Sequence, residues 1–181
     1  MRCFTSLLLL LCLQQITMAQ VPQGISAKAT IYLVRHAEKD TGNNPSLTAA
    51  GQKRAGDLMR MLQQKNIQRI YATQYKRTQQ TGDSLRLQLH IDTLIYKADT
   101  TGESIYNRII AAGDGDKNIL IIGHSNTITR IILKLGAAHF PAKDIADDQF
   151  DNLFILTYKK GKATVKVKKY GAASGVSARM Q

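Results

Sequence analysis

The stretch Ile31-Tyr32-Leu33-Val34-Arg35-His36 decides the fold, together with its counterpart Ile119-Leu120-Ile121-Ile122-Gly123-His124. Each is an apolar run, typical of a buried β-strand, that ends at a histidine. In α/β proteins the carboxyl ends of parallel strands meet at one edge of the sheet, where such folds bind ligands. We therefore expect His36 and His124 to lie close together at that edge, with Arg35 beside them.

Strands and helices alternate along the rest of the chain. Apolar periodicity predicts strands at 30–34, 67–72, 93–96 and 118–122, and helices at 48–65, 76–87, 104–112 and 125–135. Two further strands, 153–158 and 163–169, are joined at Lys160-Gly161 as a hairpin. The sequence thus predicts an α/β three-layer sandwich with a mainly parallel sheet, helices on both faces and a C-terminal β-hairpin.

The N-terminal segment has the pattern of a secretory signal peptide. Arg2 supplies the positive start, residues 7–13 the apolar centre, and Thr17-Met18-Ala19 a small-residue cleavage site. The apolar centre is too short to span a bilayer. We predict that residues 1–19 are removed and that the protein is exported, to a periplasm or out of the cell, without stable membrane insertion. An uncleaved anchor, or a lipid on Cys12, is the less favoured alternative.

The remaining chain, about 160 residues, is predicted to be one domain over 20–171 with a flexible Gly-, Ala- and Ser-rich tail over 172–181. Both cysteines, Cys3 and Cys12, lie in the segment to be removed. The mature chain then has no thiol for a disulfide, a nucleophile or a zinc site. Its length is enough for a real hydrophobic core.

Metal and cofactor sites are not indicated. The sequence has no His-Glu-x-x-His motif and no Walker-type glycine loop. The spacing Asp114-x-Asp116-x-Asn118 is similar to a calcium loop, but Ile119 and Ser125 stand where that loop needs glycine and glutamate. We predict neither a metal nor a cofactor, and interpret residues 113–116 as a helix-to-strand turn.

The net charge of +12, or one unit less without Arg2, favours anionic partners. Much of it lies in six lysines near the C-terminus that alternate with Val165 and Val167, which is typical of a protected edge strand. No aromatic residues stand between these lysines to stack on bases, so we predict no nucleic-acid partner. The lysines are Lys159, Lys160, Lys162, Lys166, Lys168 and Lys169.

A second arginine is expected at the same sheet edge. Arg77 follows the strand predicted to end at Ala72 and stands at the start of a helix, where backbone donors attract anions. The predicted helix after His124 brings the amides of Ser125 and Asn126 to that edge as well. Each residue alone also fits a structural role, but two histidines and two arginines together suit a phosphoryl group. His90 and His139 have no such placement and are interpreted as structural or surface residues.

Four motifs, in order, resemble the histidine phosphatase superfamily, which has the phosphoglycerate-mutase-like fold. Arg35-His36-Ala37 is similar to its Arg-His-Gly, with alanine in place of glycine, and residues 47–52 to its Leu-Thr-x-x-Gly-x helix start. Residues 73–81 are similar to its second-arginine segment and residues 123–125 to its second-histidine segment. The chain lacks the Arg-His-Gly-x-Arg-x-Pro signature of the acid phosphatase and phytase branch, so it resembles the compact branch.

The resemblance implies a metal-independent phosphatase that hydrolyses phosphomonoesters, or phosphohistidine, through a phosphohistidine on His36. It implies Glu103 as the general acid, with Asp99 as the rival. Some compact members work without such an acid when the leaving group is good, as in a phosphoramidate. The implied ligands of the phosphoryl group are Arg35, Arg77, His124, Ser125 and Asn43.

Two alternatives remain open at the level of sequence. One is an exported module that binds phosphate, or an anionic surface, without turnover. The other is a phosphoglycerate-type mutase, which the apparent lack of insertions over the site disfavours. If the protein is an enzyme, its predicted partner is a small phosphorylated substrate. The sequence gives no indication of the oligomeric state.

Overall fold

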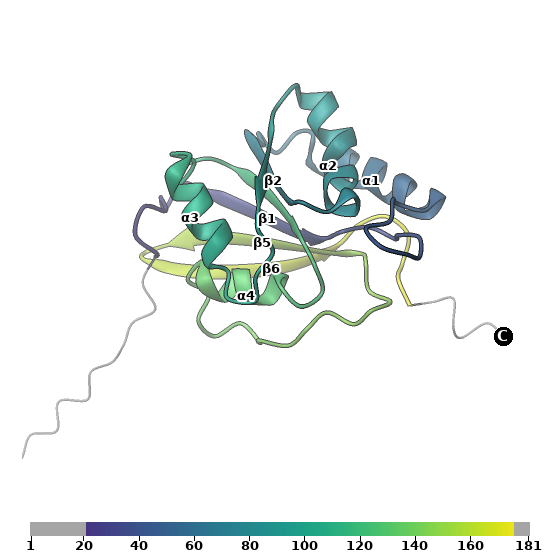
Figure 1. The fold of residues 1–181 in the computed structure, drawn as a ribbon. Helices are drawn as coiled ribbons and strands as arrows, with labels where there is room; N and C mark the ends of the chain where they lie inside the picture. The colour runs from purple at the N-terminus through teal and green to yellow at the C-terminus, as the bar shows by residue number, and fades with distance from the viewer. Residues whose placement is uncertain (1–20, 176–181) are drawn as a thin grey trace, which may run out of the picture.

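The computed structural model describes residues 21–175, so the predicted signal peptide over 1–19 lies outside the described residues and stays a prediction. One six-stranded sheet with the order β3-β2-β4-β1-β5-β6 runs through the protein (Figure 1). Its strands are β1 (Thr30–Arg35), β2 (Arg69–Thr73), β3 (Thr93–Tyr96), β4 (Ile119–Gly123), β5 (Asn152–Lys159) and β6 (Lys162–Lys169). The helices are α1 (Ala49–Leu62), α2 (Lys76–Leu89), α3 (Glu103–Ala111) and α4 (Ile128–Lys134).

The sheet is mixed. Strands β1, β4, β2 and β3 pair in parallel, whereas β5 is antiparallel to β1 and β6 is antiparallel to β5. The prediction of a mainly parallel sheet is therefore only partly right, because the hairpin adds two antiparallel strands beside β1. The hairpin itself is confirmed, and Lys160 and Gly161 both have positive φ, as a tight two-residue turn requires. Strand β6 lies at the sheet edge, as its lysine pattern predicts.

The helices cover both faces of the sheet, which confirms the three-layer sandwich. Side chains alternate along β1: Ile31 and Leu33 pack in the core under α3 and α4, and Tyr32 and Val34 pack in the core under α1 and α2. Figure 1 shows the two helix pairs on opposite sides of the strands. Among residues 21–175, no helix has the length and apolar character needed to cross a bilayer.

Helix α4 begins at Ile128, three residues later than predicted. Residues 124–127 instead form a turn, because the Thr127 side-chain oxygen accepts a hydrogen bond from the His124 amide at 2.9 Å. The Thr127 amide donates back to the His124 carbonyl at 3.1 Å. The expectation that the amides of Ser125 and Asn126 open a helix is therefore wrong. The turn fixes the backbone of His124 where it leaves β4.

A close contact holds α1 against the segment after β1. The Thr48 amide donates to the Glu38 carbonyl at 3.0 Å, and the Thr48 hydroxyl caps α1 by accepting from the Gly51 amide at 3.1 Å. A Cβ atom on Gly51 would stand 2.1 Å from the Glu38 carbonyl oxygen, which no side chain can tolerate. This approach explains why glycine stands three residues after the capping threonine.

The prediction places the start of the flexible tail, at residue 172, too early in the chain. The Ala172 carbonyl accepts a hydrogen bond from Arg54 at 2.9 Å, and the Ser174 hydroxyl accepts one from the Phe150 amide at 2.9 Å. The Ser174 amide donates to the Asp151 carboxylate at 3.2 Å. Residues 172–174 are therefore tied to the domain, and residues 176–181 lie outside the described part of the chain.

Candidate active site

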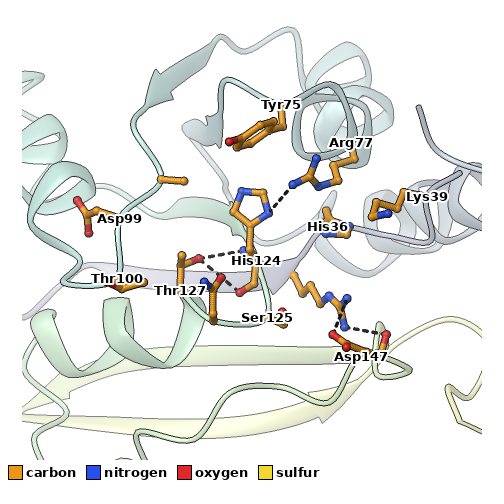
Figure 2. Close-up of a pocket in the computed structure, with 13 residues that line it drawn as sticks. His36, Lys39, Tyr75, Arg77, Asp99, Thr100, His124, Ser125, Thr127 and Asp147 are labelled. Carbon is orange, nitrogen blue, oxygen red and sulfur yellow. Dashed lines mark hydrogen bonds and ion pairs between the residues drawn. The ribbon is translucent and has the colours of Figure 1, made fainter. Parts of the chain in front are cut away.

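A cavity of about 540 Å³ opens at the carboxyl edge of the parallel strands. Its walls include Arg35, His36, Lys39, Tyr75, Arg77 and His124 (Figure 2). The ring centroids of the two histidines are 5.5 Å apart, with an interplanar angle of 63°. The structure thus brings together the four side chains that the sequence places at the ends of three strands, and it leaves His90 and His139 exposed elsewhere.

The ring of His36 is buried and carries its proton on Nδ1. This atom lies 2.8 Å from the Ala37 carbonyl oxygen, which can only accept a hydrogen bond. Nε2 of the neutral ring therefore keeps its lone pair. Burial, followed by the positive charge of Arg35, lowers the pKa of His36 from 6.5 to about 3, although the bond to Ala37 opposes this shift. The φ of Ala37 is not positive, so alanine fits where the family has glycine.

Arg35 is held by the loop that follows α4. Its Nη1 donates to the carbonyl oxygens of Ala146 at 2.8 Å and Asp147 at 3.0 Å, and its guanidinium lies 4.3 Å from the centroid of the Phe150 ring. Its Nε is buried and has no hydrogen-bond partner within residues 21–175. Its Nη2 lies 3.7 Å from the carboxylate of the exposed Asp147 and makes no hydrogen bond within the described residues, so Arg35 has donors left over for a ligand.

Arg77 reaches the cavity from the first turn of α2. Its guanidinium lies 4.4 Å from the centroid of the Tyr75 ring, and its Nη2 donates to His124 Nδ1 at 3.4 Å. Its Nε, like that of Arg35, is buried without a partner in the part of the chain described. Two guanidinium groups that line one cavity and keep N–H groups without acceptors are what an anion site requires.

The ring of His124 is also neutral at pH 7. Burial, together with the charges of Arg77 and Arg35, lowers its pKa from 6.5 to about 4. Its Nε2 lies 3.1 Å from the hydroxyl oxygen of Thr73, at the end of β2. Both imidazoles are therefore uncharged beside two guanidinium groups, and the positive charge of the site comes from the two arginines and Lys39.

The structure does not bring Glu103 to the cavity. Its carboxylate forms an ion pair with Lys134 of α4, and its side chain is 53% exposed. The prediction of Glu103 as the general acid therefore has no geometric support, because the first turn of α3 directs this side chain toward α4.

Asp99, the rival candidate, lies at the cavity wall, on the far side of His124 from His36 (Figure 2). Its carboxylate accepts the amides of Gly102 at 2.5 Å and Ser104 at 2.8 Å, where α3 begins. Burial alone raises the pKa of Asp99, but these hydrogen bonds outweigh it and hold the pKa below its usual value. A carboxylate held as an anion is poorly suited to donate a proton.

Of the two remaining predicted ligands, Ser125 and Asn43, only Ser125 lies at the cavity. Ser125 lines the cavity. Asn43 is exposed on the turn before α1 and is not among the lining residues, so the structure does not place it at the site. The side chain of its neighbour Asn44 instead accepts a hydrogen bond from the Lys76 amide at 2.9 Å. The turn thus supports the start of α2 rather than a ligand.

Sequence reasoning missed several residues of the site. Lys39 follows the Arg35-His36 motif closely enough to be suspected, and Tyr75 precedes Arg77 by two positions. Asp147 and Phe150 belong to the long loop between α4 and β5, which carries no recognisable motif. Only the fold, which lays this loop against Arg35, reveals them.

The acidic residues after α3 have a structural role. Residues 113–116 form the predicted turn between α3 and β4, and the buried Asp114 carboxylate accepts a hydrogen bond from Tyr71 at 2.6 Å and forms ion pairs with Arg69 and Lys117. Within residues 21–175, no three His, Cys, Asp or Glu side chains gather as a metal-binding group.

The two histidines make the stability of the fold depend on pH. In the folded protein their pKa values are about 3 for His36 and about 4 for His124, below the value of 6.5 for a histidine in an unfolded chain. Between these values the unfolded chain binds more protons, so the free energy of unfolding falls as the pH falls. We expect a loss of roughly 3 kcal/mol per histidine between about pH 6.5 and about pH 4, since one pKa unit corresponds to about 1.4 kcal/mol.

Urea unfolding at a series of pH values measures this effect. The reference is the double variant His36→Asn/His124→Gln, whose amides can donate to the Ala37 carbonyl and the Thr73 hydroxyl but do not titrate. The wild type should lose more stability than this variant in the acidic range. Equal pH dependence of the two proteins would contradict the assignment of both rings as neutral.

Comparison with known proteins agrees with this geometry. The model of the histidine phosphatase superfamily (branch 1) matches residues 31–99. The chain is similar to a solved structure assigned as the phosphohistidine phosphatase SixA of Agrobacterium tumefaciens, with 20% identity, a TM-score of 0.56, and coverage of 81% of this chain and 100% of that chain. The alpha-ribazole phosphatase of Shigella flexneri is 16% identical, with a TM-score of 0.60 and coverage of 81% of this chain and 98% of that chain.

A mycobacterial glucosyl-3-phosphoglycerate phosphatase, solved in complex with VO3, is 13% identical, with a TM-score of 0.58 and coverage of 78% of this chain and 99% of that chain. No curated protein matches the chain in sequence. At these identities the solved structures show a shared fold, while the matched residues 31–99 contain His36 and both arginines of the cavity. The family model and the shared fold together confirm the resemblance to the histidine phosphatase superfamily that the four ordered motifs predict.

Proposed function

We propose that the protein is a metal-independent phosphatase that hydrolyses a small phosphorylated substrate through a phosphohistidine on His36. One observation carries this proposal. A neutral imidazole with an unprotonated Nε2 shares a cavity with two guanidinium groups, each with a buried N–H that lacks an acceptor in the described structure. A phosphoryl group supplies both the electrophile for this nitrogen and the oxygens for these donors.

In the first step, the lone pair of His36 Nε2 attacks phosphorus, and the bond from phosphorus to the leaving group breaks with its electron pair on the leaving group. Arg35 and Arg77 stabilise the charge on the non-bridging oxygens, for which their planar donor groups are suited. A protonated oxygen of a monoprotonated phosphoryl group donates a hydrogen bond to His124 Nδ1, in place of the long bond from Arg77, and the proton stays on that oxygen. Phosphoryl transfer depends mainly on such positioning and charge stabilisation.

In the second step, water attacks the phosphorus of the phosphohistidine. The nitrogen–phosphorus bond breaks, and its electron pair returns to His36 Nε2. Inorganic phosphate leaves with the oxygen and the protons of the water molecule. His36 Nδ1 keeps its proton, hydrogen-bonded to the Ala37 carbonyl, throughout, so the ring is neutral again and ready for the next turnover.

The position of the carboxylates favours one class of substrate. Glu103 pairs with Lys134, and Asp99 is held as an anion at the start of α3. Substrates that need little protonation of the leaving group therefore fit best, and these are aryl phosphates and phosphoramidates such as phosphohistidine. The names of the structural relatives, which include a phosphohistidine phosphatase and a glucosyl-3-phosphoglycerate phosphatase, support a small phosphorylated substrate.

The proposal is tested with the purified protein in the presence of a metal chelator. We expect hydrolysis of p-nitrophenyl phosphate and of a phosphohistidine peptide, and much slower hydrolysis of an alkyl phosphate such as glycerol phosphate. Quenched reactions should contain an acid-labile phosphoenzyme. Phosphate binding without turnover or phosphoenzyme would instead support the non-catalytic module. Transfer of phosphate between the positions of a phosphoglycerate would support the mutase.

A further inference from the structure

Both ring nitrogens of His124 are held by one short segment, residues 73–77, at the junction of β2 and α2. Nε2 lies 3.1 Å from Thr73 Oγ1, and Nδ1 lies 3.4 Å from Arg77 Nη2. A guanidinium group has donors only, so Nδ1 must act as the acceptor. The proton of the neutral ring is therefore on Nε2 and is donated to Thr73.

This hydrogen bond is the first of three in a row, in which each group donates to the next, from His124 to Thr73, Thr78 and the Tyr75 carbonyl. Thr73 Oγ1 lies 2.9 Å from Thr78 Oγ1, which in turn lies 2.8 Å from the Tyr75 carbonyl oxygen. Since a carbonyl can only accept, the Thr78 hydroxyl donates to Tyr75 and the Thr73 hydroxyl donates to Thr78. Thr73 Oγ1 is then left with lone pairs to accept from His124. The Arg77 guanidinium, which can only donate, and the Tyr75 carbonyl, which can only accept, require the same donor-to-acceptor direction for these hydrogen bonds.

Burial makes this arrangement costly to change. The Thr73 and Thr78 side chains are fully buried, so water does not compete for their hydroxyl groups. The opposite tautomer of His124 would point its Nδ1–H at the Arg77 guanidinium. Two donors would then face each other, and the hydrogen bond between Arg77 and His124 would be lost.

We propose that Thr73, supported by Thr78, is a positioning residue that sets the tautomer and the orientation of His124. His36 and His124 are then held in opposite tautomers, with the proton on Nδ1 in His36 and on Nε2 in His124. The unprotonated Nδ1 of His124 faces Arg77 in the cavity, where it can accept a hydrogen bond from a protonated oxygen of the phosphoryl group. This last step rests on the proposed phosphatase activity, whereas the tautomer itself does not.

Nitrogen NMR of the histidine-labelled protein tests the tautomer without any substrate. The chain has four histidines, and removing them one at a time assigns the signals. We expect protonated Nε2 and unprotonated Nδ1 for His124, and the reverse for His36. A proton on Nδ1 of His124 would overturn the inference even if the protein proved to be an active phosphatase. The expected tautomers would support it even if no turnover were found.

Three variants test the role of the hydroxyl group. Thr73→Val replaces it with a methyl group of similar volume, Thr73→Ser keeps it, and Thr129→Val is the matched control. Thr129 is a buried threonine of α4 whose hydroxyl has no partner within residues 21–175. We expect Thr73→Val to alter the His124 signals and to lower kcat about 10- to 100-fold, as loss of a supporting hydrogen bond does in other sites, with a smaller change in KM.

Thr73→Ser should restore both kcat and the His124 signals, and Thr129→Val should change neither. If Thr73→Val does not fold, Thr78→Val removes the next hydroxyl of the same chain and should weaken the same two readouts. Unchanged His124 signals in a folded Thr73→Val protein would contradict the inference, whether or not kcat falls. A Thr73→Ser protein that behaves like Thr73→Val would contradict it as well.

Discussion

Replacement of His36 by alanine is expected to abolish hydrolysis of an aryl phosphate and to leave the fold intact. The side chain supplies the attacking nitrogen, whereas His124, the other histidine of the cavity, directs its unprotonated Nδ1 at Arg77. Removing the nucleophile of a covalent mechanism leaves only the slow reaction that positioning alone can support. Steady-state assays and rapid-quench detection of the phosphoenzyme measure both consequences.

Two controls make this prediction sharp. His139→Ala removes an exposed histidine outside the cavity and should leave turnover unchanged. His36→Asn can keep the hydrogen bond to the Ala37 carbonyl but has no nucleophilic nitrogen, so it should be as inactive as His36→Ala. Retained turnover in a folded His36→Ala protein would show that the nucleophile lies elsewhere. Retained turnover in His36→Asn alone would reduce His36 to a structural role.

The positions of His36 and His124 could be predicted because both follow from local sequence and one topological rule. Ile31 to Val34 and Ile119 to Ile122 are continuous apolar runs, as strands covered on both faces must be. Parallel strands then end at the same edge, so a histidine directly after each strand must meet its counterpart. Register pairs Arg35 with Gly123, one residue before each histidine, and so fixes their relation.

The general acid could not be predicted in this way. Glu103 and Asp99 lie near the start of α3, where a carboxylate is favourable both for capping a helix and for catalysis. The sequence does not distinguish these uses. The structure does, because Asp99 accepts the amides of Gly102 and Ser104 while Glu103 is drawn to Lys134. Side-chain direction at the first turn of a helix depends on tertiary packing, which periodicity does not contain.

The loop around Phe150 shows a second limit of sequence reasoning. Arg35 donates to backbone carbonyl groups of residues 146, 147 and 149, and any sequence supplies such groups. Nothing in the residue types of this loop marks it as a partner of Arg35. The same holds for Ser174, whose hydroxyl accepts from the Phe150 amide. Contacts made through backbone atoms and set by the path of the chain become visible only in the fold.

These contacts separate the roles of the two arginines. Arg35 Nη1 is occupied by backbone carbonyl groups and its guanidinium lies over Phe150, so Arg35 both holds the loop and offers a donor to the ligand. Arg77 makes one long hydrogen bond, to His124, and stacks on Tyr75. Loss of Arg35 is therefore expected to disturb the fold of the loop as well as the site. Arg77 is the better probe of anion stabilisation.

Arg77→Ala is accordingly expected to lower kcat/KM for an aryl phosphate by about 100-fold or more, as removal of a strong oxyanion donor does. It should also weaken inhibition by inorganic phosphate. Arg77→Lys keeps the charge but loses the planar set of donors, so it should recover only part of the rate.

The matched control for Arg77 is Arg86→Ala. It removes an arginine from the same helix that pairs with Asp83 and does not line the cavity. Its kinetics should be unchanged, and thermal unfolding should show both variants folded. If Arg77→Ala retained wild-type kcat/KM and phosphate inhibition, Arg77 would not contact the phosphoryl group. The anion site would then rest on Arg35 alone, whose Nη1 is already occupied by backbone carbonyl groups of the loop.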